Sequence, residues 1–459
     1  MFIPVKISNN ARLHQPRSKM TLNKQHTPVP ATIESLCHDG RGVARINGKT
    51  VFISGALAGE SITFHYTRKK ASFDEGVVDT VITQSPDRIT PPCPHFGICG
   101  GCSLQHLSAD AQRQHKHSAL AEHFMHQANT QPQQWQPAIT GPTSGYRSKA
   151  RLGVKFVPGK DKVLVGFREK NSRYIAHLNE CTVLDPRVGN ALEAISHTLY
   201  QLSVRDKIAQ IEVAMDKNTC ALILRNLKPL TDRDLEICQQ LGRDHNFRLY
   251  LQPKGIDSIH LIYPATDPEH LEYTLGATGL TLAFHPSQFT QINTTINEQL
   301  IHNAMALLTL NEKDRVLDLF CGIGNFSLPI AQQVKQVIGV DADDSAIAQA
   351  QRNAQQNEIN NASFYSDQLF APPFHAPWAQ SQYDKLVIDP PRSGALEVVS
   401  NIESFNPKKI VYISCNPATL ARDTKVLIDK GYRLATAGIA DMFPHTQHIE
   451  SIAAFSKED

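Results

Sequence analysis

Cys415 is the residue of this chain best placed to act as a nucleophile. It ends an apolar run that predicts a buried strand, and it directly precedes Asn416 and Pro417, residue types that begin helices. The positive end of a helix favours a thiolate, so we expect the pKa of the Cys415 thiol to be lowered. The alternative is a small buried apolar side chain without a chemical task, because lone cysteines commonly have that role.

A Gly-x-Gly turn upstream predicts a cofactor site. Residues 318–326 (DLFCGIGNF) read as a strand running into a turn whose glycines let a ligand approach the backbone. Asp341 ends the next strand, where a carboxylate can bind a ribose, and Asp367 after the third strand could read an adenine edge. Ser327 stands where a dinucleotide site has its third glycine, which favours S-adenosylmethionine over NAD because S-adenosylmethionine has no pyrophosphate.

A third polar stretch, residues 389–394 (DPPRSG), ends a further predicted strand. Asp-Pro-Pro followed by an aromatic residue is typical of amino-group methyltransferases, in which it holds an exocyclic amine. Arg392 occupies the aromatic position here, which counts against that chemistry. Proline pairs are also common in turns, so the stretch could be a turn alone.

A methyl donor beside a thiol predicts one acceptor in particular, carbon 5 of a uracil. That carbon is too weak a nucleophile to take a sulfonium methyl group unless a thiolate first adds to carbon 6. The adduct must then lose its carbon-5 proton to a base before the cysteine can leave. Glu450, in the apolar run HIESIAAF, is the candidate base, since a carboxylate there is costly unless it has a partner or a task.

Three cysteines, Cys93, Cys99 and Cys102, lie within the ten residues CPHFGICGGC. A disulfide, a zinc site, an iron-sulfur cluster and a redox dithiol can all begin with such a stretch. An odd total of nine cysteines and a chain start without an export signal argue against a disulfide framework, and no thioredoxin-like βαβ unit surrounds the stretch. Thiolates suit both zinc and iron-sulfur clusters, so the spacing indicates a metal without choosing between them.

The elements that must position the polar residues near the C-terminus form a repeating pattern. From Arg315 onward, apolar strands alternate with helical stretches, which predicts a parallel, doubly wound sheet. Its strands are expected at VLDLF, QVIGVD, SFYSD, KLVIDPP and KIVYISCNP. Ligands bind such sheets at the carboxyl ends of the strands, and the polar residues singled out above lie at or near those ends.

The N-terminal region has a different pattern. Five short apolar runs between about residues 31 and 82 predict a small β-barrel with a hairpin at Asn47-Gly48. Phe64, Tyr66 and Phe73 could stack on bases or fill the core. Basic residues on this barrel would suit phosphate contacts, namely Arg41, Arg45, Lys49, Arg68, Lys69 and Lys70.

Between these regions, the sequence predicts a helix over about 108–127 and a Gln/Pro-rich linker over 126–137. A mainly β segment follows over 146–290, with helices near 187–203 and 231–243. No motif assigns chemistry to that segment.

Composition limits the class of protein. A chain of 459 residues suggests about three domains. Residues 1–180 hold 23 Lys and Arg against 12 Asp and Glu, which indicates a polyanionic partner or a solvated basic surface. No apolar run approaches the roughly 18 residues of a membrane span, and the chain start lacks a signal-peptide pattern. We therefore expect a soluble, cytoplasmic protein.

Several runs together closely resemble the RNA (uracil-5-)-methyltransferases, and the resemblance extends from about residue 22 to the C-terminus. The runs are FTQIN (289–293), DLFCGIGNF, VIGVDAD, DPPRSG, VYISCNPATLARD and DMFPHTQHIES. The resemblance implies Cys415 as the nucleophile and Glu450 as the base that removes the carbon-5 proton. It also implies cofactor contacts from Gln291, Phe320, Asn325, Asp341 and Asp389, and an adenine contact from Asp367 or Gln368.

The N-terminal half shares this resemblance. The run DGRGVARI looks like the start of a TRAM domain. Cys93, Cys99 and Cys102, with Cys181 in HLNECTVLDP, resemble the ligands of the family branch that carries a [4Fe-4S] cluster. A TRAM domain together with the cluster points to the branch that methylates 23S rRNA rather than to the bacterial tRNA branch.

The expected protein is a monomeric enzyme that transfers the methyl group of S-adenosylmethionine to carbon 5 of a specific 23S rRNA uridine. One alternative is a different RNA uridine, at a second 23S site or in tRNA. Others are methylation of a base amino group and a non-catalytic iron-sulfur RNA-binding protein.

The expected fold is multidomain α/β. A basic tail (1–21) precedes an OB-like TRAM β-barrel (22–86), an iron-sulfur and mainly β domain (87–285) and a Rossmann-like S-adenosylmethionine-dependent methyltransferase domain (286–459). The cluster would clip the helix and linker onto the central β domain, remote from Cys415, as a structural and RNA-positioning element.

Overall fold

The computed structural model describes residues 27–265, 270–372 and 374–457, so the expected basic tail over 1–21 lies outside the described residues. The chain divides into two compact units. The described residues up to Ser35 and Gly42–Gln84 form the first unit, and Leu36–Arg41 with the described chain from Ser85 onward form the second. Within these ranges, no helix is long and apolar enough to cross a membrane.

The first unit is built on a six-stranded sheet with the order β1-β5-β6-β4-β3-β2. The strands are β1 (Val29–Thr32), β2 (Ser35–Leu36), β3 (Gly42–Ile46), β4 (Lys49–Ser54), β5 (Ser61–Lys69) and β6 (Phe73–Thr83). Asn47 and Gly48 have φ of 51° and 79°, so they form the tight turn predicted between β3 and β4. The amide of Glu34 donates to the Val43 carbonyl at 2.8 Å, which joins the end of β1 to β3.

The aromatic residues of this unit divide between core and surface. Phe64 is fully buried, in a core that includes Val51 and Ile53. Tyr66 and Phe73 are only half-buried. The Lys69 ammonium lies 4.4 Å from the Tyr66 ring, and the Lys70 ammonium lies 4.2 Å from the Phe73 ring. Phe64 is therefore a core residue, whereas the other two rings lie beside positive charge.

The second unit contains a central six-stranded sheet with the order β13-β12-β11-β10-β8-β9. Its strands are β8 (Lys149–Val157), β9 (Lys162–Gly166), β10 (Ile208–Met215), β11 (Cys220–Asn226), β12 (Phe247–Leu251) and β13 (His260–Tyr263). Helices α2 (Pro186–Gly189), α3 (Leu192–Gln201) and α4 (Asp232–His245) agree with the predicted helical regions. α3 packs against β9 and α4 against β12.

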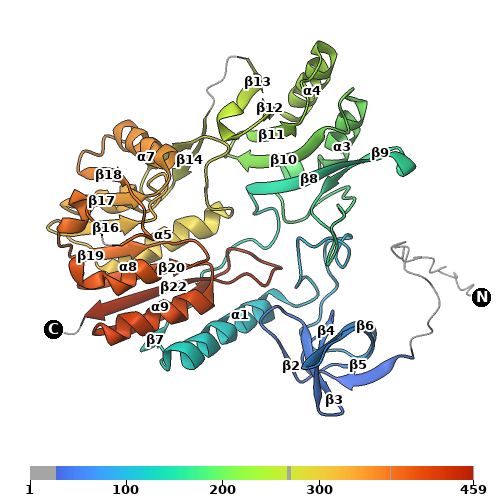
Figure 1. Cartoon of the computed structure of the whole chain (residues 1–459), viewed down its shortest axis with the longest axis horizontal. Helices are drawn as coiled ribbons and strands as arrows, with labels where there is room; N and C mark the ends of the chain where they lie inside the picture. The colour runs from blue at the N-terminus through green and yellow to red at the C-terminus, as the bar shows by residue number, and fades with distance from the viewer. Residues whose placement is uncertain (1–26, 266–269, 373, 458–459) are drawn as a thin grey trace, which may run out of the picture. The chain divides into compact units, whose positions relative to one another are not determined.

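The C-terminal part of this unit holds an eight-stranded sheet with the order β18-β17-β16-β19-β20-β22-β21-β7. Its strands are β7 (Gln134–Trp135), β16 (Arg315–Leu319), β17 (Gln336–Asp341), β18 (Ala362–Ser366), β19 (Lys385–Ile388), β20 (Lys409–Ser414), β21 (Tyr432–Ala440) and β22 (Glu450–Lys457). β16 to β20 are mutually parallel, which confirms the predicted doubly wound sheet (Figure 1). The strand order reverses between β16 and β19, and such a point is where a ligand crevice forms.

Helices connect and cover this sheet. They are α5 (Thr294–Leu308), α6 (Ser327–Ala331), α7 (Asp344–Gln356), α8 (Leu396–Ser400) and α9 (Pro417–Asp429). The helix predicted over 108–127 is α1 (Ala109–His123), which continues as a π-helical turn over Phe124–Ala128 and packs against α9 and β21.

Two further segments join the eight-stranded sheet or its helices. The predicted Gln/Pro-rich linker contains β7, which pairs with β21, so this linker supplies an edge strand. The hairpin of β14 (Leu271–Leu275) and β15 (Leu280–Phe284) is held to α7. The side-chain amide of Asn353 accepts from the Ala283 amide at 2.9 Å and donates to its carbonyl at 3.1 Å.

Candidate active site

Three of the predicted site residues lie at one edge of the eight-stranded sheet. Asp389 follows β19 and Cys415 follows β20, and these strands are parallel neighbours. Glu450 begins β22, which runs antiparallel to β20 with Ser414 opposite Ser451. This register places Cys415 opposite Glu450. The Ser451 hydroxyl ties the two strands together there by donating to the Ser414 carbonyl at 3.1 Å.

The start of α9 fixes the backbone next to Cys415. The Asn416 side chain accepts a hydrogen bond from the Ala418 amide at 3.1 Å, and Pro417 is the first helical residue. This confirms the predicted helix start. The Asn416 side-chain amide also donates to the Arg392 carbonyl at 2.9 Å. The DPPRSG stretch is thereby attached to the segment that carries the thiol.

The pKa of the Cys415 thiol is raised to about 11, so the expected lowering is wrong. Burial is the largest cause, the negative charges of Glu450 and Asp389 add to it, and Arg392 opposes them. Burial and like charge both disfavour the thiolate, and here they outweigh the helix terminus. The sequence predicted the helix start and assigned Glu450 and Asp389 to the same site, but it did not predict that burial and these carboxylates together outweigh the helix terminus.

Both carboxylates at this edge also have raised pKa values. Burial raises the pKa of Asp389 to about 7, which the Gln291 side-chain amide opposes by donating to it at 3.5 Å. Burial raises the pKa of Glu450 well above its usual value, Asp389 adds to the shift, and Arg392 opposes it. A carboxylate with a raised pKa is a stronger base once ionised, so Glu450 has the character required to accept a proton from carbon.

A groove opens beside Cys415. Its walls come from α1 and its π-helical continuation, from the start of α9, and from the loop that precedes β22. Besides Cys415 and Asn416, its polar lining is His38, Glu122, His123, His126, Arg392, Gln447 and His448. Apart from Arg392, these residues were not predicted to belong to the site. Gln447 and His448 lie in the run DMFPHTQHIES, which the resemblance includes without giving either residue a role. The other residues lie in no such run, and only folding brings them close to Cys415.

The Gly-x-Gly turn and Asp341, both predicted to contact a cofactor, lie together at the carboxyl edge of the sheet. Gly322 and Gly324 have φ of 54° and 93°, which favours glycine, and the space next to the Gly322 Cα is open. The Asp341 carboxylate accepts from the Gly322 amide at 2.9 Å and from the Asp343 amide at 2.9 Å. Two backbone amides thus orient this carboxylate at the end of β17. Its geometry suits a group that receives ribose hydroxyls.

The other predicted cofactor residues differ in how their side chains are used. Asn325 exchanges two hydrogen bonds of 2.9 Å with Asn297 and accepts from the Tyr273 hydroxyl at 3.0 Å, so its amide braces the turn against α5. Phe320 also has a positive φ, 64°, and its ring centroid lies 5.5 Å from that of Phe370.

The two candidate adenine contacts are likewise distinct. One carboxylate oxygen of Asp367 accepts from the Trp378 indole N–H at 2.8 Å. The other oxygen accepts from the backbone amide of Gln368 at 2.8 Å. The Gln368 side chain is exposed. The Asp367 carboxylate is therefore held rigidly by protein groups, whereas Gln368 faces solvent.

Cys93, Cys99, Cys102 and Cys181 line a common cavity. The loop that carries the first three is attached to the central β region, since the Gly100 amide donates to the Arg168 carbonyl and the Lys170 amide to the Ile98 carbonyl, each at 2.8 Å. Both of these hydrogen bonds join backbone groups. All four cysteines are unpaired thiols, so the structure contains no disulfide among them.

Whether this cavity suits a metal centre depends on the spacing of its thiols. Among the described residues, no group of three or more His, Cys, Asp or Glu side chains that could hold a metal ion is found. The donor set of the cavity is nevertheless four thiols, which iron-sulfur clusters and zinc both accept.

Known proteins match this chain over most of its length. Residues 108–368 match the family described as tRNA (Uracil-5-)-methyltransferase, and residues 310–442 match a methyltransferase-domain family. The chain is 46% identical to 23S rRNA (uracil(1939)-C(5))-methyltransferase RlmD of Alcanivorax borkumensis, with 94% of this chain and 97% of that protein covered. It is 47% identical to the protein of the same name from Francisella tularensis subsp. holarctica, with 93% and 96% covered.

A solved structure shares the fold. Pyrococcus abyssi tRNA (uracil-54, C5)-methyltransferase, in complex with S-adenosyl-L-homocysteine, superposes with a TM-score of 0.70 at 23% identity, covering 93% of this chain and 100% of that one. The sequence matches extend across both the candidate active site and the cysteine cavity. This chain belongs to the RNA (uracil-5-)-methyltransferase family.

Proposed function

We propose that this protein transfers the methyl group of S-adenosylmethionine to carbon 5 of a specific uridine in 23S rRNA, giving 5-methyluridine. The observation that carries the proposal is the placement of Cys415 opposite Glu450, at the same sheet edge as the turn braced by Asp341. The names of the relatives matched over nearly their whole length support 23S rRNA as the substrate.

In this proposal Cys415 acts first. With a thiol pKa of about 11, the resting enzyme near neutral pH holds mainly the uncharged thiol. The thiol first loses its proton to solvent, a proton that the sulfur takes back after it leaves the product. The thiolate donates an electron pair to carbon 6 of the uracil, and the displaced double-bond electrons form an enolate with density on carbon 5. S-adenosylmethionine, when bound, supplies the methyl group that carbon 5 takes as the methyl–sulfur bond breaks.

Glu450 then completes the reaction. Its carboxylate takes the carbon-5 proton, the electrons of that bond re-form the carbon 5–carbon 6 double bond, and the sulfur–carbon 6 bond breaks to release Cys415. Each methyl transfer therefore releases one proton, which Glu450 passes to solvent before the next turnover. The raised pKa of Glu450 suits this task because the group must both accept and release a proton.

We assign cofactor binding to the carboxyl edge of the sheet. The residues are Gln291, Phe320, Asn325, Asp341 and Asp389, with Asp367 or Gln368 at the adenine. The open space beside Gly322 and the oriented Asp341 carboxylate support the assignment. Because the Asn325 amide is bonded to Asn297 and Tyr273, its contribution would be to hold the turn in shape.

We assign a [4Fe-4S] cluster to Cys93, Cys99, Cys102 and Cys181. Their convergence on one cavity, which Phe96 and Phe167 also line, supports the assignment. In this role the cluster would be a covalent cross-link between the cysteine loop and the segment around Cys181, with no part in methyl transfer.

The remaining assignments concern the domains and their partners. Residues 22–86 would be the TRAM domain, 87–285 the iron-sulfur and central β domain, and 286–459 the methyltransferase domain. The exposed Arg68 and Lys69, near the half-buried Tyr66 ring, suit contacts to RNA phosphates and bases. We propose a cytoplasmic monomer.

The test is covalent trapping on 23S rRNA fragments that carry 5-fluorouracil. Fluorine cannot leave as a proton does, so the wild-type protein should form a stable RNA adduct that requires S-adenosylmethionine, and Cys415→Ala should form none. Absence of an adduct with wild type, or an equal amount with Cys415→Ala, contradicts the mechanism. Mapping 5-methyluridine in rRNA from a deletion strain would identify the nucleotide.

A further inference from the structure

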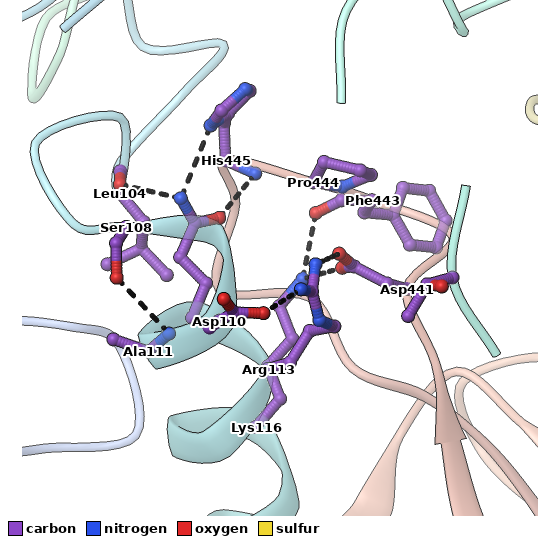
Figure 2. Close-up of polar contacts among 12 residues, drawn as sticks. Leu104, Ser108, Asp110, Ala111, Arg113, Lys116, Asp441, Phe443, Pro444 and His445 are labelled. Carbon is purple, nitrogen blue, oxygen red and sulfur yellow. Dashed lines mark hydrogen bonds and ion pairs between the residues drawn. The ribbon is translucent and has the colours of Figure 1, made fainter. Parts of the chain in front are cut away.

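The loop over residues 441–449 joins β21 to β22 and leads directly into Glu450. Its second half lines the groove beside Cys415 through Gln447 and His448. Its first half is bonded to α1 (Figure 2). It is also bonded to the chain that follows the cysteine loop. The loop that precedes Glu450, the candidate base, is therefore held by residues that lie far from it in the sequence.

Lys116 provides one of these contacts from inside the protein. Its side chain is only 1% exposed. The ammonium donates to the Asp441 carboxylate at 2.8 Å and to the Phe443 carbonyl at 2.9 Å (Figure 2). A buried lysine is unfavourable unless it is paired and hydrogen-bonded, and both partners here belong to the loop. Lys116 thus fixes a side chain and a backbone carbonyl at the beginning of the loop.

Gln112, one helical turn earlier on α1, provides a second contact. Its side-chain carbonyl accepts from the His445 amide at 2.8 Å, and its amide donates to the carbonyls of Leu104 at 3.1 Å and Leu107 at 2.7 Å. His445 has a φ of 67°, a left-handed conformation that is uncommon for residues other than glycine. Such a conformation persists where surrounding bonds fix it, and Gln112 supplies one of these bonds.

The chain after Cys102 supplies the others. The amides of Ser103 and Leu104 both donate to the His445 carbonyl at 2.9 Å. The Tyr146 hydroxyl donates to the Pro444 carbonyl at 3.0 Å. Between Asp441 and His445, the loop is thus held mainly by residues that lie outside the catalytic sheet.

We propose that Gln112 and Lys116 are positioning residues for proton removal, because they hold the 441–449 loop so that Glu450 faces carbon 5 of the uracil bound to Cys415. This inference rests on the proposed function. Glu450 pairs with Ala440, so these two residues stand at the ends of the 441–449 loop. Cys415 lies instead between β20 and the start of α9, so the step before proton removal depends less on this loop. Loss of the Gln112 and Lys116 contacts should therefore slow proton removal while leaving adduct formation nearly unchanged.

The test uses Lys116→Met, which keeps most of the side-chain volume and removes the charge and both hydrogen bonds. On unmodified RNA, turnover should fall at least tenfold and a covalent methylated adduct should accumulate. On 5-fluorouracil RNA, the rate of adduct formation should stay within about twofold of wild type, because that readout ends before proton removal. A general loss of stability would lower both rates together.

Two further variants keep the test decisive. Lys116→Met combined with Asp441→Asn leaves no buried carboxylate without its lysine. It also removes the 3.9 Å ion pair of Asp441 with Arg113, but Arg113 keeps Asp110 as a partner. The double variant should therefore fold even if the single variant does not, and it should still accumulate the adduct. Gln112→Leu removes the hydrogen bond to the His445 amide, and this variant should also accumulate the adduct. The matched control is Lys385→Met, which breaks another buried ion pair, with Asp314 at 2.9 Å, at the opposite end of the sheet. It should leave the ratio of the two rates unchanged.

The proposal is overturned if the Lys116 and Gln112 variants resolve the adduct at the wild-type rate, or if both rates fall in the proportion seen for Lys385→Met. A wild-type protein that forms no adduct at all would instead overturn the proposed function. The two failures are therefore distinguishable.

Discussion

At the scale of single residues, burial and neighbouring negative charge disfavour ionisation at this edge of the sheet. Burial is the largest cause of the raised pKa of Cys415, followed by the charges of Glu450 and Asp389. Burial is also the largest cause of the raised pKa of Glu450, followed by the charge of Asp389. In the proposed mechanism the thiolate and the carboxylate act in turn, so the two groups need not be ionised for the same step.

The pH dependence of Cys415 reactivity follows from its raised pKa. Because the thiolate is the reactive form and the pKa is about 11, the rate of Cys415 alkylation by iodoacetamide should rise about tenfold per pH unit between pH 7 and 10. Glu450→Gln should shift this profile to lower pH, since it removes a negative charge. Peptide-level mass spectrometry measures the alkylation of Cys415 separately from that of the other cysteines. A rate that reaches a plateau below pH 9 in the wild type would show that the thiol pKa is not raised.

Glu450→Gln should also block the end of the reaction. Without a base, the methylated adduct cannot lose its carbon-5 proton, so turnover should fall by roughly 10²–10⁴-fold while a covalent RNA adduct accumulates on unmodified RNA. Denaturing gels measure the adduct and tritium release from [5-³H]uridine RNA measures proton removal. Normal tritium release from this variant would assign the base to another residue.

At the scale of elements, the start of α9 connects two parts of the site. Asn416 caps the helix with its side-chain oxygen and holds the Arg392 carbonyl with its side-chain nitrogen. Cys415 lies between the end of β20 and the capped start of α9. The strand β22, which begins with Glu450, pairs with β20. This rigid arrangement replaces the electrostatic activation that the helix terminus alone was expected to supply.

Asn416 variants can separate these two contacts. Asn416→Ala should cost about 1 kcal/mol of stability through loss of the cap and should lower turnover as well. Asn416→Asp keeps the capping oxygen and removes the donor to Arg392, so its stability should stay near wild type while turnover falls. Thermal unfolding and methyl incorporation measure the two effects. Equal stability of Asn416→Ala and wild type would mean that the cap contributes nothing.

At the scale of the whole molecule, the cysteine cavity and the active site belong to one connected region of the second unit. The segment after Cys102 bonds to His445, whose loop leads to Glu450. The proposed cluster would cross-link that segment to Cys181 across a long stretch of chain, which restricts the unfolded state. A structural cluster could thus influence catalysis without exchanging electrons.

Cys181→Ser tests this role. It should lower iron content and the broad visible absorption of an anaerobic preparation, and it should reduce stability by roughly 2–4 kcal/mol, the range for cross-links that close long loops. Cys238→Ser, at a buried cysteine outside the cavity, is the control and should retain iron. Purification of the wild-type protein with zinc in place of iron would contradict the cluster and favour a zinc site.

The sequence by itself determined the features that depend on local order along the chain. The alternation of strands and helices after Arg315, the turn at Asn47-Gly48 and the helix start at Asn416 were all predictable, because periodicity, turn residues and caps act over a few positions. The helix start beside Cys415 and the carboxylate in the apolar run HIESIAAF made Cys415 and Glu450 candidates for nucleophile and base, and the resemblance implied the same roles.

Only the tertiary structure decided what surrounds those residues. The raised pKa of Cys415 depends first on burial and then on the charges of Glu450 and Asp389. The strand β7 lies in a segment whose composition predicted a linker. The contacts of Lys116 with Asp441 join positions more than three hundred residues apart, and no local pattern encodes them. Burial and electrostatic environment arise from packing between distant segments, so they appear only when the chain has folded.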